Sequence, residues 1–139
     1  MSMKIIKYIE ENFNEYLEGT RRFLMQPSIS GSGEGIIECA DMLKEILEEL
    51  GAKVTLLRYG GHPIVYGKLK GNSKGKPLIC YGMYDVQPPE PLEAWIAPPF
   101  EARIVDGKLI ARGAINTKGP LMAFIYGVKS VLEIRGRSQ

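Results

Sequence analysis

Hydrophobic side chains recur at helical spacing in three stretches of the chain and at strand spacing in its middle. The first stretch predicts one long amphipathic helix over about residues 3–25, ended by Pro27. A second one-sided stripe predicts a helix over about residues 33–50. The largely apolar stretch 121–132 predicts a third helix, which should lie buried against a sheet.

Alternating and continuous apolar runs between these helices predict strands. Residues 54–56 and 64–69 alternate as half-buried strands do, and the apolar run in residues 77–84 predicts a third, buried strand. An Asp106-Gly107 turn between two β-prone arms predicts a hairpin over residues 102–111. The order helix, helix, three strands, hairpin, helix predicts an α/β fold.

Polar residues follow two of the predicted strands. Asp85 comes directly after the third strand and precedes a proline-rich loop, and a polar run at residues 112–119 follows the hairpin. In α/β sheets the crevice at the carboxyl ends of strands is where ligands bind. We therefore expect any functional site to begin at these two strand ends.

Composition excludes several classes of function. The 139 residues suit a single domain, and 45% hydrophobic with 24% charged residues is typical of a globular chain. A net charge of +2 without a basic stripe argues against nucleic-acid binding, and the lysines at positions 68, 70, 74 and 76 predict a solvated turn. No apolar run approaches the about 18 residues of a membrane span, and no signal peptide is evident, so we expect a cytoplasmic protein with Cys39 and Cys80 as free, buried thiols.

Other motifs favour structural roles. The glycines at residues 31–35 follow a helix rather than a strand, which argues against a dinucleotide loop, and the glycine spacing at residues 71–77 is too short for a P-loop. The only histidine, His62, lies beside Gly and Pro and is expected at the surface. Trp95, the sole tryptophan, is either an edge of the core or part of a functional loop. Arg112 and Lys118 are expected to serve turn geometry and local hydrogen bonding.

Four ordered motifs together resemble the amino-terminal part of the catalytic domain of M20-type metallopeptidases, the group of carnosinase-type dipeptidases, acetylornithine deacetylases, succinyl-diaminopimelate desuccinylases and carboxypeptidases. The motifs are Tyr81-Gly-Met-Tyr-Asp-Val-Gln-Pro88, Trp95 to Phe100, Asp106-Gly-Lys-Leu109 and Arg112-Gly-Ala through Lys118-Gly-Pro120. The resemblance implies a partial α/β/α layer with a mixed sheet over residues 1–139, without the lid domain and the last strands of the sheet.

The resemblance also implies a site with two zinc ions and a bridging water that attacks an amide carbonyl. The family's zinc-ligand His position is Met83 here, and its bridging Asp position is Asn116. Asp85 corresponds to the carboxylate that orients that His. A neutral thioether suits copper(I) rather than zinc, and an amide lacks the charge that holds two dications together, so we expect no bound cofactor.

We therefore expect a degenerate, truncated M20-like fragment without independent catalytic activity. The alternative is one half of a zinc-dependent amidohydrolase or dipeptidase, acting on peptides or N-acyl amino acids once a separate C-terminal part completes it. An exposed sheet edge and an apolar helix face predict self-association, with a separate C-terminal half as the other possible partner.

Overall fold

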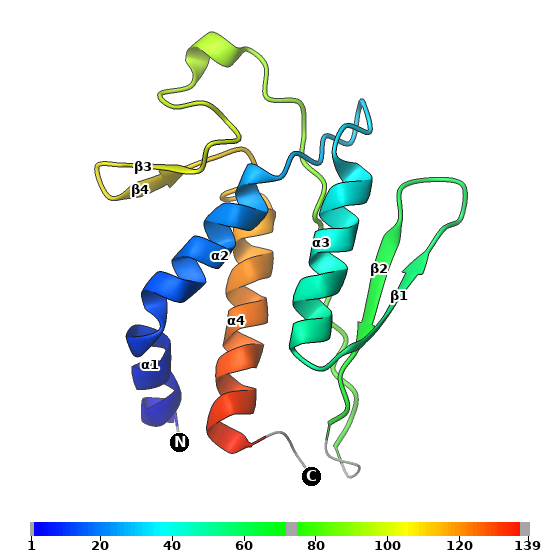
Figure 1. Ribbon diagram of the computed structural model, residues 1–139, viewed down its shortest axis with the longest axis vertical. Helices are drawn as coiled ribbons and strands as arrows, with labels where there is room; N and C mark the ends of the chain where they lie inside the picture. The colour runs from blue at the N-terminus through cyan, green and yellow to red at the C-terminus, as the bar shows by residue number, and fades with distance from the viewer. Residues whose placement is uncertain (1, 72–74, 137–139) are drawn as a thin grey trace.

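The computed structural model describes residues 2–71 and 75–136, so part of the lysine-rich turn lies outside the described residues. The described residues form helices and two small antiparallel sheets (Figure 1), which confirms the α/β class. The elements are α1 (Ser2–Glu11), α2 (Phe13–Met25), α3 (Ile36–Glu49), β1 (Lys53–Leu57), β2 (Ile64–Lys68), the 3-10 turn η1 (Leu92–Ala94), β3 (Arg103–Val105), β4 (Lys108–Ile110) and α4 (Lys118–Arg135).

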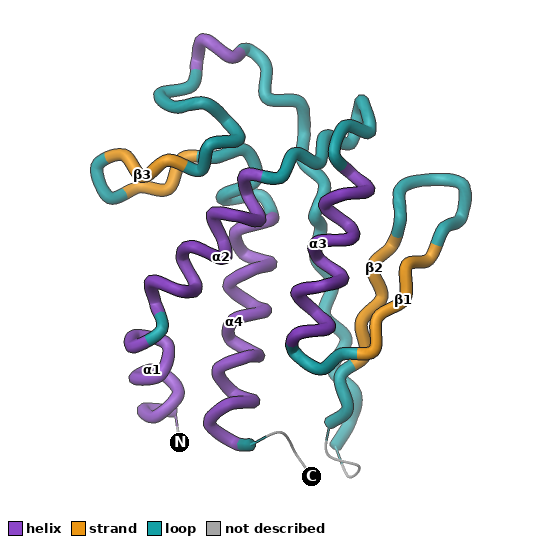
Figure 2. The backbone as a smooth tube through the Cα atoms, in the orientation of Figure 1, coloured by secondary structure: helices purple, strands orange, loops and turns teal. Residues whose placement is uncertain are grey.

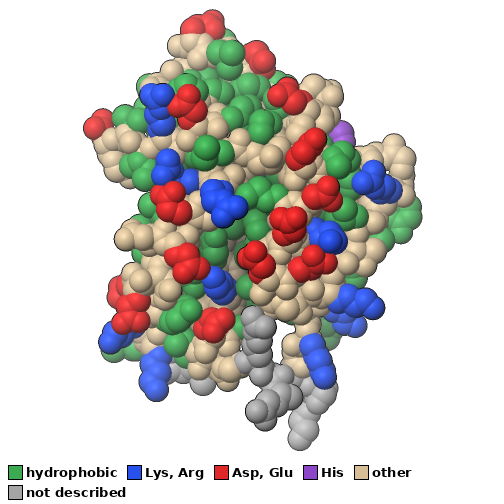
Figure 3. All heavy atoms as spheres, in the orientation of Figure 1, with side chains coloured by type: hydrophobic (Ala, Val, Ile, Leu, Met, Phe, Trp, Pro, Cys, Tyr) green, Lys and Arg blue, Asp and Glu red, His purple; other side chains and the backbone are tan. Residues whose placement is uncertain are grey.

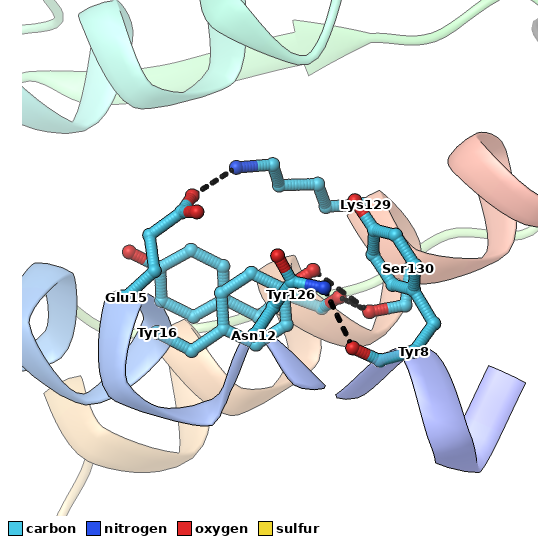
Figure 4. Close-up of polar contacts among 7 residues, drawn as sticks. All are labelled: Tyr8, Asn12, Glu15, Tyr16, Tyr126, Lys129 and Ser130. Atoms are coloured by element: carbon cyan, nitrogen blue, oxygen red, sulfur yellow. Dashed lines mark hydrogen bonds and ion pairs between the residues drawn. The ribbon is translucent and has the colours of Figure 1, made fainter. Parts of the chain in front are cut away.

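The long helix predicted at the amino terminus is two helices, so that prediction is wrong in its continuity. The break falls at Asn12, whose φ of −106° and ψ of 10° are not helical. Its side-chain Nδ2 donates a hydrogen bond of 2.8 Å to the carbonyl oxygen of Tyr8 (Figure 4). The main-chain N–H of Asn12 donates to the same oxygen at 3.1 Å, so the side chain shares this acceptor with the helical hydrogen bond, a local effect that the apolar spacing does not report.

A tyrosine pair joins α2 to α4 (Figure 4). The rings of Tyr16 and Tyr126 stack with centroids 4.2 Å apart, and the Tyr16 hydroxyl lies 3.0 Å from the Ser130 hydroxyl. Lys129 Nζ lies 2.7 Å from Glu15 Oε1 at the exposed rim of the same contact. The stacked, hydrogen-bonded tyrosines fix the two helices against each other, whereas the exposed ion pair contributes little.

The main core lies where α2, α3 and α4 meet, with α3 also packed on β1 and β2. Its buried members are Phe23, Ile36, Cys39, Ala40, Leu43, Leu50, Tyr84, Met122 and Ile125. The predicted third helix is α4, which begins at Lys118, earlier than predicted, and packs mainly on α1 and α2 rather than on a sheet as expected. The pair β1–β2 lies on one side of this layer of helices, and the pair β3–β4 lies on the other (Figure 2).

The predicted hairpin is confirmed. β3 and β4 pair antiparallel, with Val105 opposite Lys108. Asp106 and Gly107, between them, both have positive φ, at 49° and 73°. Two successive positive φ angles match the turn that follows the twist of a hairpin, and Asp-Gly tolerates them better than most pairs.

The predicted third strand is not formed among the described residues. Leu78, Ile79 and Tyr81 are 86%, 90% and 83% exposed, and Cys80 is exposed rather than buried as predicted. The strands pair in two separate antiparallel sheets instead of one mixed sheet, and the isolated bridge between Ile29 and Val86 is parallel. The apolar run has the composition of a buried strand, but no described segment pairs with it as a strand.

The described helices include none that combines the length and the apolar character needed to cross a membrane. On the face shown in Figure 3, acidic and basic side chains intermingle over the helices. This mixture is typical of solvated helix faces.

Candidate active site

The loop after α2 holds the segment that carries Asp85, at the end of the predicted third strand. Val86 N donates a hydrogen bond of 2.8 Å to Ser28 O, and Ser30 N donates one of 2.9 Å to Val86 O. The buried Ser28 hydroxyl donates to Tyr84 O at 2.7 Å. Residues on both sides of Asp85 are therefore fixed, while Asp85 itself is half-buried and Met83 is 37% exposed.

The second strand end packs directly against the first. A Cβ at Gly113 would lie 2.8 Å from Val86 Cγ1, and the φ of Gly113 is +88°. Only glycine fits this close approach and this backbone conformation without strain. The structure thus brings the two predicted strand ends together. Asn116 lies beyond Gly113 in an exposed turn, with a cis peptide bond to Thr117.

Lys118 ties the second strand end to the loop after α2. Its side chain is fully buried, and Nζ donates hydrogen bonds of 2.6 Å to Gln26 O and 3.3 Å to Ser28 Oγ. Nζ also lies 4.6 Å from the centroid of the Phe23 ring. Burial lowers the pKa of this ammonium group, and the neighbouring Cys39 offsets only part of that lowering. Lys118 thus serves hydrogen bonding as expected, but its partner Gln26 lies 92 positions away in the sequence.

Sequence reasoning also missed the role of Tyr84. Its side chain is 9% exposed, and its hydroxyl donates a hydrogen bond of 2.6 Å to Pro63 O, just before β2. Burial raises the pKa of Tyr84 to about 12. The exposed His62 next to Pro63 is at the surface as predicted, with Nε2 3.0 Å from Ser30 O.

Arg112 and Trp95 organise the proline-rich loop. The Arg112 guanidinium lies 4.9 Å from the centroid of the Trp95 ring, and its Nη2 donates to Pro88 O at 3.0 Å. The Trp95 indole Nε1 donates to Pro89 O at 2.7 Å. Trp95 therefore holds the backbone of its own loop, and Arg112 connects that loop to the second strand end.

A groove of about 350 Å³ lies between α2, α3 and α4. Its charged walls include Glu15, Glu18, Arg22 and Lys129. The groove follows the carboxyl-terminal half of α4, whereas the strand ends meet at the beginning of that helix. It is therefore separate from the candidate site.

Comparison with known proteins identifies the family. The sequence profile described as peptidase family M20/M25/M40 matches residues 79–138, which include both strand ends. The chain is similar to this family over these residues. The match begins inside the exposed segment that was predicted to be a strand and runs through α4.

Individual relatives support the same assignment. The chain is 29% identical to a Beta-Ala-His dipeptidase of Rattus norvegicus, covering 91% of this chain and 29% of that protein. It is 36% identical to a succinyl-diaminopimelate desuccinylase of Psychromonas ingrahamii, covering 76% of this chain and 27% of that protein.

Solved structures extend the similarity to the fold. An M20 family metallo-carboxypeptidase of Sulfolobus solfataricus is 44% identical with a TM-score of 0.83, covering 87% of this chain and 28% of the other. Human carnosine dipeptidase 1 shares the fold, with a TM-score of 0.89 at 24% identity, covering 97% of this chain and 32% of the other. The chain thus spans less than one third of the length of each of these relatives.

The donor groups present at the candidate site do not fit a pair of zinc ions. Met83 offers a neutral thioether and Asn116 a neutral amide, so Asp85 supplies the negative charge among these three positions. Within residues 2–71 and 75–136, no three His, Cys, Asp or Glu side chains gather as metal ligands would. Zinc sites in proteins are built from thiolate, imidazole and carboxylate groups. We therefore derive no catalytic step through zinc.

Proposed function

We propose that these residues form a non-catalytic M20 scaffold, which keeps the family's fold at the two strand ends but does not bind the zinc pair and does not hydrolyse peptides by itself. The observation that carries the proposal is the replacement of both ligand positions, by Met83 and Asn116. Neither side chain is a thiolate, an imidazole or a carboxylate, the groups that build zinc sites in proteins.

The surrounding scaffold supports this view, because it does not depend on the two replaced residues. Lys118, Ser28 and Tyr84 hold the strand ends through main-chain carbonyl groups and buried hydroxyls. Met83 and Asn116 are exposed and take no part in the core. The framework of the site is thus preserved although its metal-binding groups are not.

A second candidate function is a contribution to a zinc-dependent amidohydrolase completed by further polypeptide. The observation that favours it is the kinship with dipeptidases and a desuccinylase, of which the chain spans less than one third. The substrates of such a complex would be peptides or N-acyl amino acids. A cytoplasmic location belongs to the same proposal, supported by the free state of Cys39 and Cys80.

Zinc content tests the proposal directly. Purified chain incubated with zinc and desalted should retain well under about one zinc per chain by mass spectrometry of the metal, because the donors are neutral. The variant Met83→His with Asn116→Asp should retain roughly tenfold more zinc, yet should not hydrolyse a dipeptide. A control pair, Met3→His with Asn14→Asp, adds the same groups at exposed positions of α1 and α2.

Three results would count against the proposal. Stoichiometric zinc in the unmodified chain would show that Met83 and Asn116 do not prevent binding. Zinc-dependent hydrolysis of a dipeptide by the unmodified chain would show that the site is catalytic. Equal zinc retention by the site variant and the control pair would refute the assignment of these positions to the metal site.

A further inference from the structure

We draw no further inference here: the strongest candidate, the groove of about 350 Å³ between α2, α3 and α4, is lined by apolar and acidic side chains of which Glu15 already pairs with Lys129, and nothing in the structure shows what covers it.

Discussion

Tyr84→Phe tests whether the candidate site is held by a buried hydrogen bond. The substitution keeps the aromatic ring in the core and removes the hydroxyl that donates to Pro63 O at 2.6 Å. Pro63 is buried, so its carbonyl oxygen loses its partner in a place that water does not readily reach. Near neutral pH the free energy of unfolding should fall by about 1–2 kcal/mol, the usual cost of such a loss.

The same hydrogen bond predicts a pH dependence. The pKa of Tyr84 is about 12 in the folded chain because of burial, against an ordinary value of 10.0. Above pH 10 the unfolded chain therefore releases this proton while the folded chain retains it, and stability that is present below that pH is lost as the pH rises toward 12. At about pH 11 the loss is at most about 1.4 kcal/mol, and less where solvent screens the side chain.

Phe at position 84 cannot ionise, so the difference in stability between the two chains should shrink with pH. Urea unfolding followed by circular dichroism at about pH 7.5 and about pH 11 measures it, with most of the difference expected to vanish at the higher pH. Tyr66→Phe, at a residue 55% exposed in β2, is the control and should change the free energy of unfolding by less than about 0.5 kcal/mol. A deficit of Tyr84→Phe that is equal at both pH values would refute the reasoning.

Two further predictions concern α4 and the loop beside it. Gly119→Ala should lower the free energy of unfolding by about 2–3 kcal/mol, because the added Cβ would overlap the carbonyl oxygen of Ala114 in the preceding turn. Gly127→Ala in the same helix meets no atom and should raise the free energy of unfolding by about 0.5–1 kcal/mol. Urea unfolding measures both, and equal effects of the two substitutions would contradict the reasoning. Arg112→Ala should shift the fluorescence of Trp95, the sole tryptophan, to longer wavelength because its stacked cation is lost, and the exposed Arg103→Ala should not; a shift in both or neither would refute the contact.

The elements that sequence predicted correctly are those specified by neighbouring residues. Periodic apolar positions located α3 and α4, and the Asp106-Gly107 pair located the hairpin, because helices and tight turns depend on residues a few positions apart. The break at Asn12 was missed because one side chain bonding to one carbonyl leaves the apolar period unchanged. Spacing therefore predicted the type of element better than its continuity.

The prediction of a third strand was wrong for a different reason. The apolar pattern of the segment indicates only the environment that a strand would need on both faces and both edges. A strand exists only when another segment pairs with it, and no described residue of this chain pairs with residues 77–83.

At the candidate site, too, the chemistry of single side chains can be read from sequence, whereas contacts between distant residues cannot. The proposal for Met83 and Asn116 rests on sequence alone, because the donor chemistry of a residue depends on the side chain itself. The buried role of Lys118 could not be predicted from sequence, because a lysine after a polar turn usually lies in solvent and its partner Gln26 is 92 positions away. Met83 and Asn116 are exposed, and the buried contacts that hold the two predicted strand ends use other residues. Substitutions at Met83 or Asn116 should therefore change stability little, whereas loss of Lys118 should release both predicted strand ends from the core.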